Sequence, residues 1–313
     1  MTVLDAILPL FVLLGLGWLL ARRAVLDDAG IRGLSAFIFK ITIPALLIRA
    51  IAEEPLPTGT DLTLVVAYFG ASLAIYALAA LIGRTFFDLD LAQAGMMALM
   101  AVFSNVVVIG IPLMDALFGA EGLRPLLILI TFHSAVLLPL TTALVVWGKR
   151  DGDESLVSSM FDVLKNPLVA AILIAGVIAA TGITLPPLVD EVLAYLAAAA
   201  VPGALVALGA TLATLETGGE RGNVGERGNV TVLIGLKLFL HPLVVFLCVG
   251  VLADLPPIYV TVATLTAALP VGVNGFLFAQ HYGVWVRRAA NAVLITTVLS
   301  LLTLPFLMTW LTG

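Results

Sequence analysis

The stretch TLTAALPVGVNGFLFAQHYG, residues 264–283, is apolar enough to lie in a membrane-spanning helix, yet Pro270, Gly272, Asn274 and Gly275 interrupt it near its middle. Proline removes a backbone donor and clashes with the carbonyl one turn earlier, so a break of this kind frees backbone groups. In hydrocarbon those groups must find partners within the protein. The stretch therefore predicts a broken helix whose interruption lines a polar cavity.

The composition indicates an integral membrane protein. Apolar residues make up 61% of the 313 positions and charged residues 11%, with a mean hydropathy of +1.16, whereas soluble domains are about half apolar and a quarter charged. The net charge of −5 is small, and the 15 Lys and Arg lie mostly between apolar runs, which excludes a basic face for nucleic acid. The single cysteine, Cys248, excludes an internal disulfide and a cysteine-based metal cluster.

Apolar runs of the length of a membrane span recur along the whole chain. A helix needs about 20 mostly apolar residues to cross the hydrocarbon core, and runs this long exclude a β-barrel. We expect an all-α polytopic membrane protein whose lipid partner is the bilayer. The first run is expected to be retained, because no small-residue cleavage site follows it. Ten helices, numbered 1 to 10, are predicted at residues 3–21, 33–51, 62–83, 94–118, 123–147, 166–181, 189–213, 230–252, 259–282 and 289–311.

Basic residues in alternate connections predict the orientation, since the side richer in Lys and Arg is cytoplasmic. Only Arg49 and Arg124 lie on the poorer side. Both termini are then expected outside the cell, and the tandem GERGNV copies at 219–230 inside it. The richer side carries Arg22, Arg23, Arg32, Arg84, Lys149, Arg150, Lys165, Arg221, Arg227, Arg287 and Arg288.

Proline spacing suggests an internal repeat. Pro9 and Pro167 are 158 residues apart, and so are Pro44 and Pro202. An odd number of spans per half turns the second half over, as in many secondary transporters. We therefore predict two inverted five-helix repeats, residues 1–150 and 151–313.

The repeat pairs helix 4 with helix 9, and both are interrupted at similar depth. Freed backbone groups, helix ends and amides at two facing breaks could hold a ligand, and helix N-termini favour anions. The alternative is a pair of proline kinks and small residues used only for packing. The candidate substrate residues are Ser104, Asn105, Gly110 and Pro112 in helix 4 and Pro270, Gly272 and Asn274 in helix 9.

At these residues the chain resembles the auxin efflux carrier family, which includes plant PIN-type auxin exporters and bacterial malonate or malate carriers. The resemblance covers nearly the whole chain, and the order and spacing of its motifs are specific. The motifs are ILPLFVLLGLGWLLARRAVLDD, GLSAFIFKITIPALLIRAI, FSNVVVIGIPLM, LKNPLVAAIL, LHPLVV, AALPVGVNGFLFAQHYGV and SLLTLPF.

The resemblance implies that helices 4 and 9 cross at the substrate site, and that helices 3–5 and 8–10 form a transport domain. This domain would move in an elevator-like manner against a scaffold of helices 1, 2, 6 and 7. Asn105 matches the crossover asparagine and Pro270 the crossover proline. Asn166 and Pro167 match the start of the plant NPNTY-type motif, whose second asparagine is Leu168 here. The resemblance also implies small organic anions as substrates, a homodimer and, for a bacterial member, the inner (plasma) membrane.

Other polar residues within the spans have both functional and structural interpretations. Lys40 and Lys237 could attract an anion or extend to the interface. His133 and His241 could carry a proton or simply pack. Asp115 is a candidate for ion coupling or an interfacial acid. The further candidate Asn166 can contact substrate or cap helix 6 ahead of Pro167.

No hydrolase, metalloprotease or phosphate-loop motif occurs, so we expect neither an enzyme nor a cofactor or metal site. We expect a secondary or potential-driven carrier of small organic anions that works in the direction of export, because an inside-negative potential drives anions outward. The open alternatives are a sodium-coupled symporter of the bile-acid carrier type, coupling by protons, and a membrane receptor that does not transport.

Overall fold

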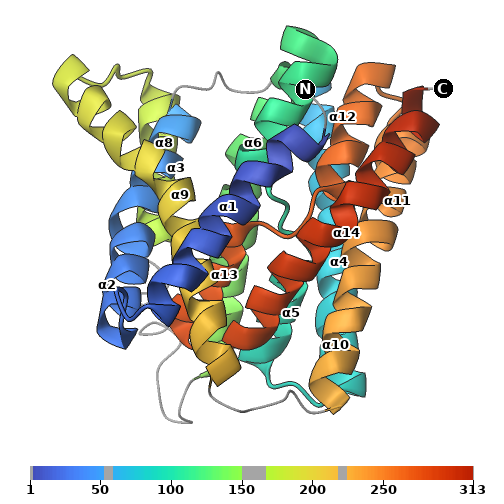
Figure 1. Cartoon of the computed structure of the whole chain (residues 1–313). Coiled ribbons are helices and arrows are strands. Elements are labelled where there is room, and N and C mark those ends of the chain that lie inside the picture. Colours follow the sequence, from blue (N-terminus) through green and yellow to red (C-terminus); the bar gives the residue numbers. More distant parts are fainter. Residues whose placement is uncertain (1–2, 53–58, 150–166, 218–223, 313) are drawn as a thin grey trace.

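The computed structural model describes residues 3–52, 59–149, 167–217 and 224–312. Over these residues the chain is helical, and its β contact is an isolated bridge between Ser104 and Val271. Figure 1 shows long helices running between two ends of the molecule, with both termini at the same end. The described elements, where η marks a π-helical segment, are α1 (Val3–Arg22), α2 (Asp28–Phe37), η1 (Ile38–Thr42), α3 (Ile43–Ala52), α4 (Thr60–Phe86), α5 (Leu91–Val102), η2 (Val106–Gly110), α6 (Ile111–Gly148), α8 (Pro167–Thr181), α9 (Pro187–Thr217), α10 (Val224–Gly235), η3 (Leu236–Leu240), α11 (His241–Phe246), η4 (Leu247–Leu252), α12 (Pro257–Ala268), α13 (Val273–Tyr282) and α14 (Val286–Thr312).

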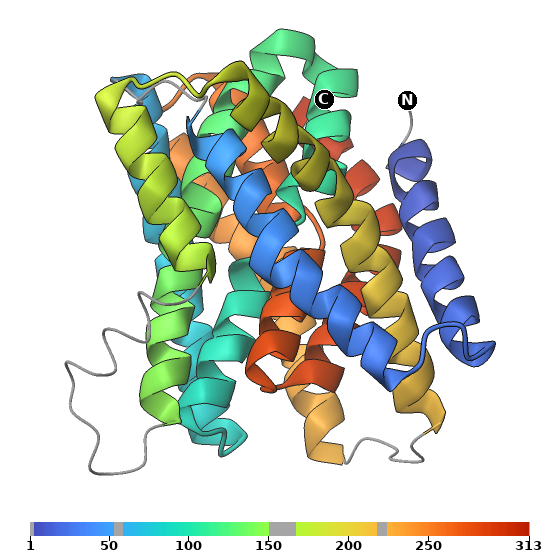
Figure 2. The ribbon, with the colours of Figure 1, turned by 90° about the vertical axis from the view of Figure 1, so that its left-hand side faces the viewer.

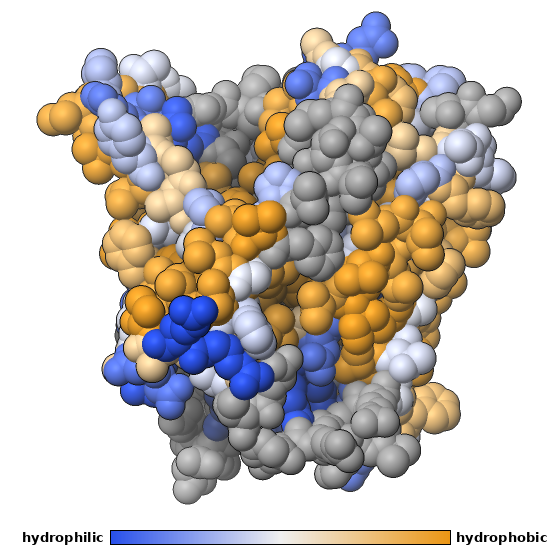
Figure 3. Space-filling view, in the orientation of Figure 1, coloured by the Kyte–Doolittle hydropathy of each residue, from blue (hydrophilic) through white to orange (hydrophobic). Residues whose placement is uncertain are grey.

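The apolar surface is that of a multi-pass membrane protein. Six helical stretches among the described residues are long and apolar enough to cross a bilayer, and four shorter apolar helices accompany them. In Figure 3 hydrophobic residues form a band across the middle of the molecule, with hydrophilic residues toward its ends. Described helix covers most of each predicted span, with interruptions in spans 4 and 9, while the count of ten spans and the inverted repeat stay predictions.

The predicted start of helix 2 is wrong, whereas the predicted interruption of helix 9 is present. Helix 2 begins at Asp28 instead of Gly33, because the Asp27 carboxylate caps it by accepting the Gly30 N–H at 2.7 Å. Helix 9 is interrupted near its middle as predicted, because α12 ends at Ala268 and α13 begins at Val273. Hydropathy detected the apolar segment of helix 2 but not the Asp27 cap at which the helix begins.

The long element α6 is two helices joined at a kink. Gly119 has φ 55° and ψ −143°, which is a conformation that side chains other than glycine rarely adopt. The part before Gly119 is the second half of predicted helix 4, and the part after it contains predicted helix 5. The predicted turn between these two helices is thus present.

The helices pack in two groups. The first helix group comprises α1, α2, η1, α3, α8 and α9, in which α1 packs along α9 and α3 packs against α8 and α9. Figure 2 shows this group from its own side. The second helix group comprises α4, α5, η2, α6 and α10–α14 with η3 and η4, and its closest pairs are α4 with α5, α5 with α6, and α11 with α12.

Ion pairs at the helix ends connect elements within each group. In the first group Arg49 Nε of α3 donates to Asp190 Oδ1 of α9 at 2.8 Å. In the second group Asp61 of α4 accepts from Arg124 Nη2 of α6 at 3.0 Å and from the Tyr259 hydroxyl of α12 at 2.8 Å. Each ion pair therefore lies inside one group and not between the two.

Candidate functional site at the helix crossover

The breaks in predicted helices 4 and 9 lie against each other and exchange backbone hydrogen bonds. The Asn105 N–H donates to the Pro270 carbonyl at 2.9 Å, and the Gly272 N–H donates to the Phe103 carbonyl at 2.9 Å. These two bonds flank the bridge between Ser104 and Val271. Each break thus satisfies backbone groups that the other has freed, as hydrocarbon surroundings require. We call residues 103–105 and 269–272 the crossover.

The residue types at the crossover suit this close approach. Pro270 has no N–H to satisfy but keeps a carbonyl that accepts from Asn105. A Cβ on Gly272 would lie 3.0 Å from the Ser104 carbonyl oxygen and 3.0 Å from the Phe103 ring. Glycine at 272 therefore allows the two backbones to come within hydrogen-bonding distance.

Two side chains from neighbouring helices accept the remaining crossover N–H groups. The Ser104 N–H donates to His133 Nε2 of α6 at 3.0 Å, and the Val271 N–H donates to Thr296 Oγ1 of α14 at 3.0 Å. An imidazole that accepts through Nε2 carries its proton on Nδ1 when neutral. His133 Nδ1 is buried and has no hydrogen-bond partner among the described residues. In this conformation His133 acts as a backbone acceptor.

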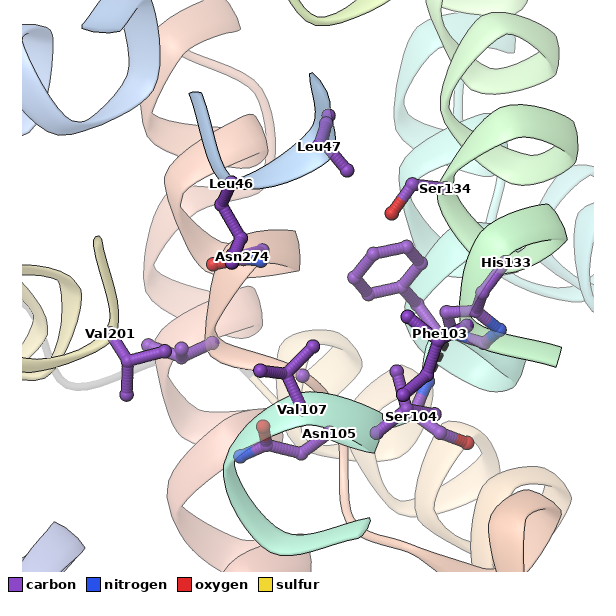
Figure 4. Close-up of a pocket in the computed structure, with 14 residues that line it drawn as sticks. Leu46, Leu47, Phe103, Ser104, Asn105, Val107, His133, Ser134, Val201 and Asn274 are labelled. Carbon is purple, nitrogen blue, oxygen red and sulfur yellow. Dashed lines mark hydrogen bonds between the residues drawn. The ribbon is translucent and has the colours of Figure 1, made fainter. Parts of the chain in front are cut away.

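A narrow cavity lies between the crossover and the first helix group. Water centres can occupy about 30 Å³ of it, which is room for about two water molecules. Figure 4 shows side chains from α3, α9 and α6 converging on it with those of the crossover. Its lining residues are Leu46, Leu47, Phe103, Ser104, Asn105, Val106, Val107, Ile130, His133, Ser134, Val201, Gly272, Val273 and Asn274.

The polar part of this cavity comes from amides and helix starts. Asn105 precedes η2 and Gly272 precedes α13, and neither start has a side-chain cap. The first N–H groups of a helix lack partners within it and favour an anion. The Asn274 side-chain oxygen is buried without a hydrogen-bond partner in the described structure. The arrangement places N–H donors at a cavity whose other polar lining includes the Ser134 side chain and the Asn274 oxygen.

Lys237 lies on the other side of the crossover. Its side chain is fully buried, and its ammonium donates to Ser104 Oγ at 2.5 Å and to the Ala267 carbonyl at 2.8 Å. Figure 4 shows the side chains of Ser104 and Asn105 pointing in opposite directions, so the hydroxyl faces away from the Asn105 amide. The interpretation that Lys237 reaches the membrane interface is wrong, because its ammonium finds two acceptors inside the protein.

The sequence marks Lys237 as a cation within a span but does not connect it with the break. The available signal was a cation within an apolar run, which is costly unless it is paired. Its spacing from the end of the helix favoured the interface instead. Only the folded chain brings α5, η3 and α12 together around the ammonium.

The second buried histidine, His241, belongs to the same interior. Its Nε2 lies 2.9 Å from Ser72 Oγ of α4, and its ring centre lies 6.0 Å from that of Tyr68. His241 does not line the cavity. Its role in proton coupling stays a prediction, as does that of His133.

The remaining candidate residues occupy varied positions. Ser104, Asn105, Gly272, Asn274 and His133 line the cavity and Pro270 lies in the crossover, whereas Lys40 and Asp115 are exposed. Gly110 packs near Leu269 and Leu126. Pro112 is in the first turn of α6, and Asn166 lies outside the described residues. Their contacts with substrate stay predictions.

Comparison with known proteins shows the family to which the chain belongs. The family model described as "Membrane transport protein" matches residues 2–154 and 153–308. A protein of Rhizobium meliloti (strain 1021), named "Putative malonate transporter", is 29% identical over 306 residues, covering 96% of this chain and 93% of that protein. The resemblance to the auxin efflux carrier family is confirmed, and with it the expectation of a transporter that is not an enzyme.

Proposed function

Because this chain belongs to the membrane transport protein family, we propose that it is a secondary carrier which binds a small carboxylate anion at the crossover. The observation that carries the proposal is the cavity in which Asn105, Asn274 and the start of α13 meet. Uncapped helix starts and amide groups are donors, and a carboxylate only accepts when ionised. The name of the Rhizobium protein supports malonate as the first anion to test.

The small size of the cavity supports an alternating-access cycle. Water centres can occupy only about 30 Å³ of the cavity, which is room for about two water molecules, so we propose that the crossover and the first helix group separate when a carboxylate binds. The facing residues of that group, Leu46, Leu47 and Val201, are apolar. An apolar face offers no directional bonds that would hold the crossover in one position. We propose that the second helix group moves along the first, as an elevator-type transport domain against a scaffold.

Two further features support the division into repeats and the orientation that we propose. The two matched family segments overlap at residues 153–154, close to the predicted boundary between residues 150 and 151. The described basic residues Arg22, Arg84 and Lys149 lie at the ends of α1, α4 and α6, which all reach the end of the molecule opposite the termini (Figure 1). We propose that this end is cytoplasmic in a bacterial inner membrane.

Energetics favour export. Moving one negative charge outward across an inside-negative membrane releases about 2.3 kcal/mol per 100 mV. Export of an anion then needs no coupled ion, whereas uptake of a dianion does. Equal flux with and without an imposed potential would contradict net anion movement.

Flux into proteoliposomes tests the function. Labelled malonate is loaded on one side, and its movement is followed with and without excess unlabelled carboxylates. Asn105→Ala should lower the rate about 10- to 100-fold, since a hydrogen bond to a charged group contributes about 1.5–3 kcal/mol. Asn291→Ala, in α14 and away from the cavity, is the control and should transport like the unaltered protein. Normal transport by Asn105→Ala would contradict the assignment of the binding site. Absence of flux for every carboxylate tested would contradict the proposed function.

A further inference from the structure

The buried ammonium of Lys237 lies where two half-helices end. α5 ends at Val102 and α12 ends at Ala268, and both chains continue directly into the crossover. The carboxyl end of a helix carries roughly half a negative charge, concentrated on its last carbonyls. Two such ends meeting in a dry interior leave negative potential that needs a cation or a donor.

The contacts of Lys237 match this need. The ammonium donates to the Ala267 carbonyl in the last turn of α12 and to the hydroxyl of Ser104, two residues beyond the end of α5. Its two bonds therefore reach both broken helices. η3, a π-helical segment of five residues, carries Lys237 toward them.

No acidic side chain balances this lysine in the described part of the chain. The ion pairs there are those of Arg49 with Asp190 and of Arg124 with Asp61, and no carboxylate interacts with Lys237. The titratable side chains that interact electrostatically with Lys237 are His133 of α6 and His241 of α11, and Tyr68 of α4 lies beside His241. A second cation on either imidazole would be repelled at this range. The counter-charge of Lys237 is thus the pair of helix ends.

In carriers with broken helices, half-helix carboxyl ends and unwound carbonyls are the groups that coordinate a coupling cation. We propose that Lys237 is a tethered cation that occupies this position permanently. A mobile Na⁺ would find this position filled by the Lys237 side chain and its acceptors already engaged. The consequence for transport, which rests on the carrier function proposed above, is that flux is independent of Na⁺.

The first test uses the unaltered protein. Thermal unfolding in detergent is compared in NaCl and in choline chloride of equal ionic strength, and malonate flux is measured under the same replacement. We expect the two Tm values to agree within about 1 °C and the two flux rates to agree within about twofold. A twofold difference in rate is well below the tenfold change that corresponds to about 1.4 kcal/mol. A Na⁺-dependent rise in Tm or a tenfold Na⁺-dependent rise in flux would overturn the assignment.

The second test removes the ammonium. Lys237→Met keeps much of the side-chain volume and should lower Tm by about 5 °C or more, because two buried acceptors lose their donor. Arg32→Met removes one positive charge from the exposed face of α2 and serves as the control. Lys237→Ala leaves space for a small ammonium ion. Methylammonium should raise its Tm more than tetramethylammonium, which has the same charge and no N–H donor.

The outcomes separate this inference from the proposed function. If Lys237→Met matches the control in Tm, or if both ammonium ions act equally on Lys237→Ala, the tethered-cation role is wrong. If the variants do not fold, the Na⁺ replacement on the unaltered protein still decides. Flux that requires Na⁺ would leave the carrier function standing and overturn the role of Lys237. Absence of carboxylate flux would remove the carrier function, while the unfolding measurements would still decide the role of Lys237.

Discussion

The carbonyl of Pro270 accepts a hydrogen bond from the N–H of Asn105 at 2.9 Å, although the two residues lie in opposite halves of the chain. Asn105 contributes an N–H that its own helix does not use, and Pro270, which has no N–H, contributes its carbonyl as the acceptor. The bond joins the two broken segments and leaves the Asn105 amide side chain at the cavity. The stability of the crossover and the composition of the candidate site are therefore coupled.

Substitution of Gly272 by alanine should open the crossover. The new Cβ would lie 3.0 Å from the Ser104 carbonyl oxygen, and backbone has to shift to relieve this contact. We expect a loss of about 1–3 kcal/mol of stability from overpacking and loss of malonate flux. Gly70→Ala is the control, because Gly70 is at an exposed position of α4 where a Cβ meets nothing within 4 Å. A Gly272→Ala protein with unchanged Tm and flux would contradict the close approach.

Thr296→Val should leave the Val271 N–H without an acceptor. An unsatisfied buried donor costs about 1–3 kcal/mol, so Tm should fall, while Thr296→Ser should retain most of the stability. The neighbouring Thr297→Val is the matched control, because the Thr297 hydroxyl donates only to the Val293 carbonyl of its own helix. Equal effects of the two valine substitutions would show that the crossover contact is unimportant.

The contact between α1 and α9 should not tolerate a methyl group at Gly17. A Cβ there would lie 2.1 Å from the Val206 carbonyl oxygen, whereas at Gly15 it meets nothing within 4 Å. Gly17→Ala should separate the two helices and lower Tm, because close packing through small residues holds membrane helices together. Gly15→Ala should leave Tm unchanged or raise it. The comparison is made by thermal unfolding of the purified proteins, and a stable Gly17→Ala protein would argue against this packing.

Phe39 and His281 form a contact between the two helix groups that should limit access to the cavity. Their rings stack at a centroid distance of 4.0 Å with an interplanar angle of 13°. The test uses a protein that carries Cys248→Ala and Ser134→Cys, so that its one thiol lies at the cavity. Adding Phe39→Ala should increase modification of this thiol by a membrane-impermeant reagent supplied on the Arg22 side. Phe246→Ala, whose ring instead contacts Trp310, is the control and should not increase it. Equal modification rates in both variants would exclude a seal at Phe39.

Particular residues show how far sequence reasoning reached. The run of Pro270, Gly272 and Asn274 predicted a break, and the offset between the halves pointed to Asn105 as its counterpart. The structure contains both breaks at these residues and places Asn105, Gly272 and Asn274 around one cavity. These features are local, because proline and glycine act on the backbone within one helical turn.

The sequence by itself determined that the chain lies in a membrane and where two of its helices break, since hydropathy and backbone chemistry are properties of short segments. Tertiary structure alone decided that Lys237 lies against the crossover. It also decided that His133 and Thr296 accept hydrogen bonds from backbone N–H groups of the crossover. Such partners come from segments far apart in the chain. Their distances depend on how the helices pack, and no periodicity or spacing in a single sequence encodes them.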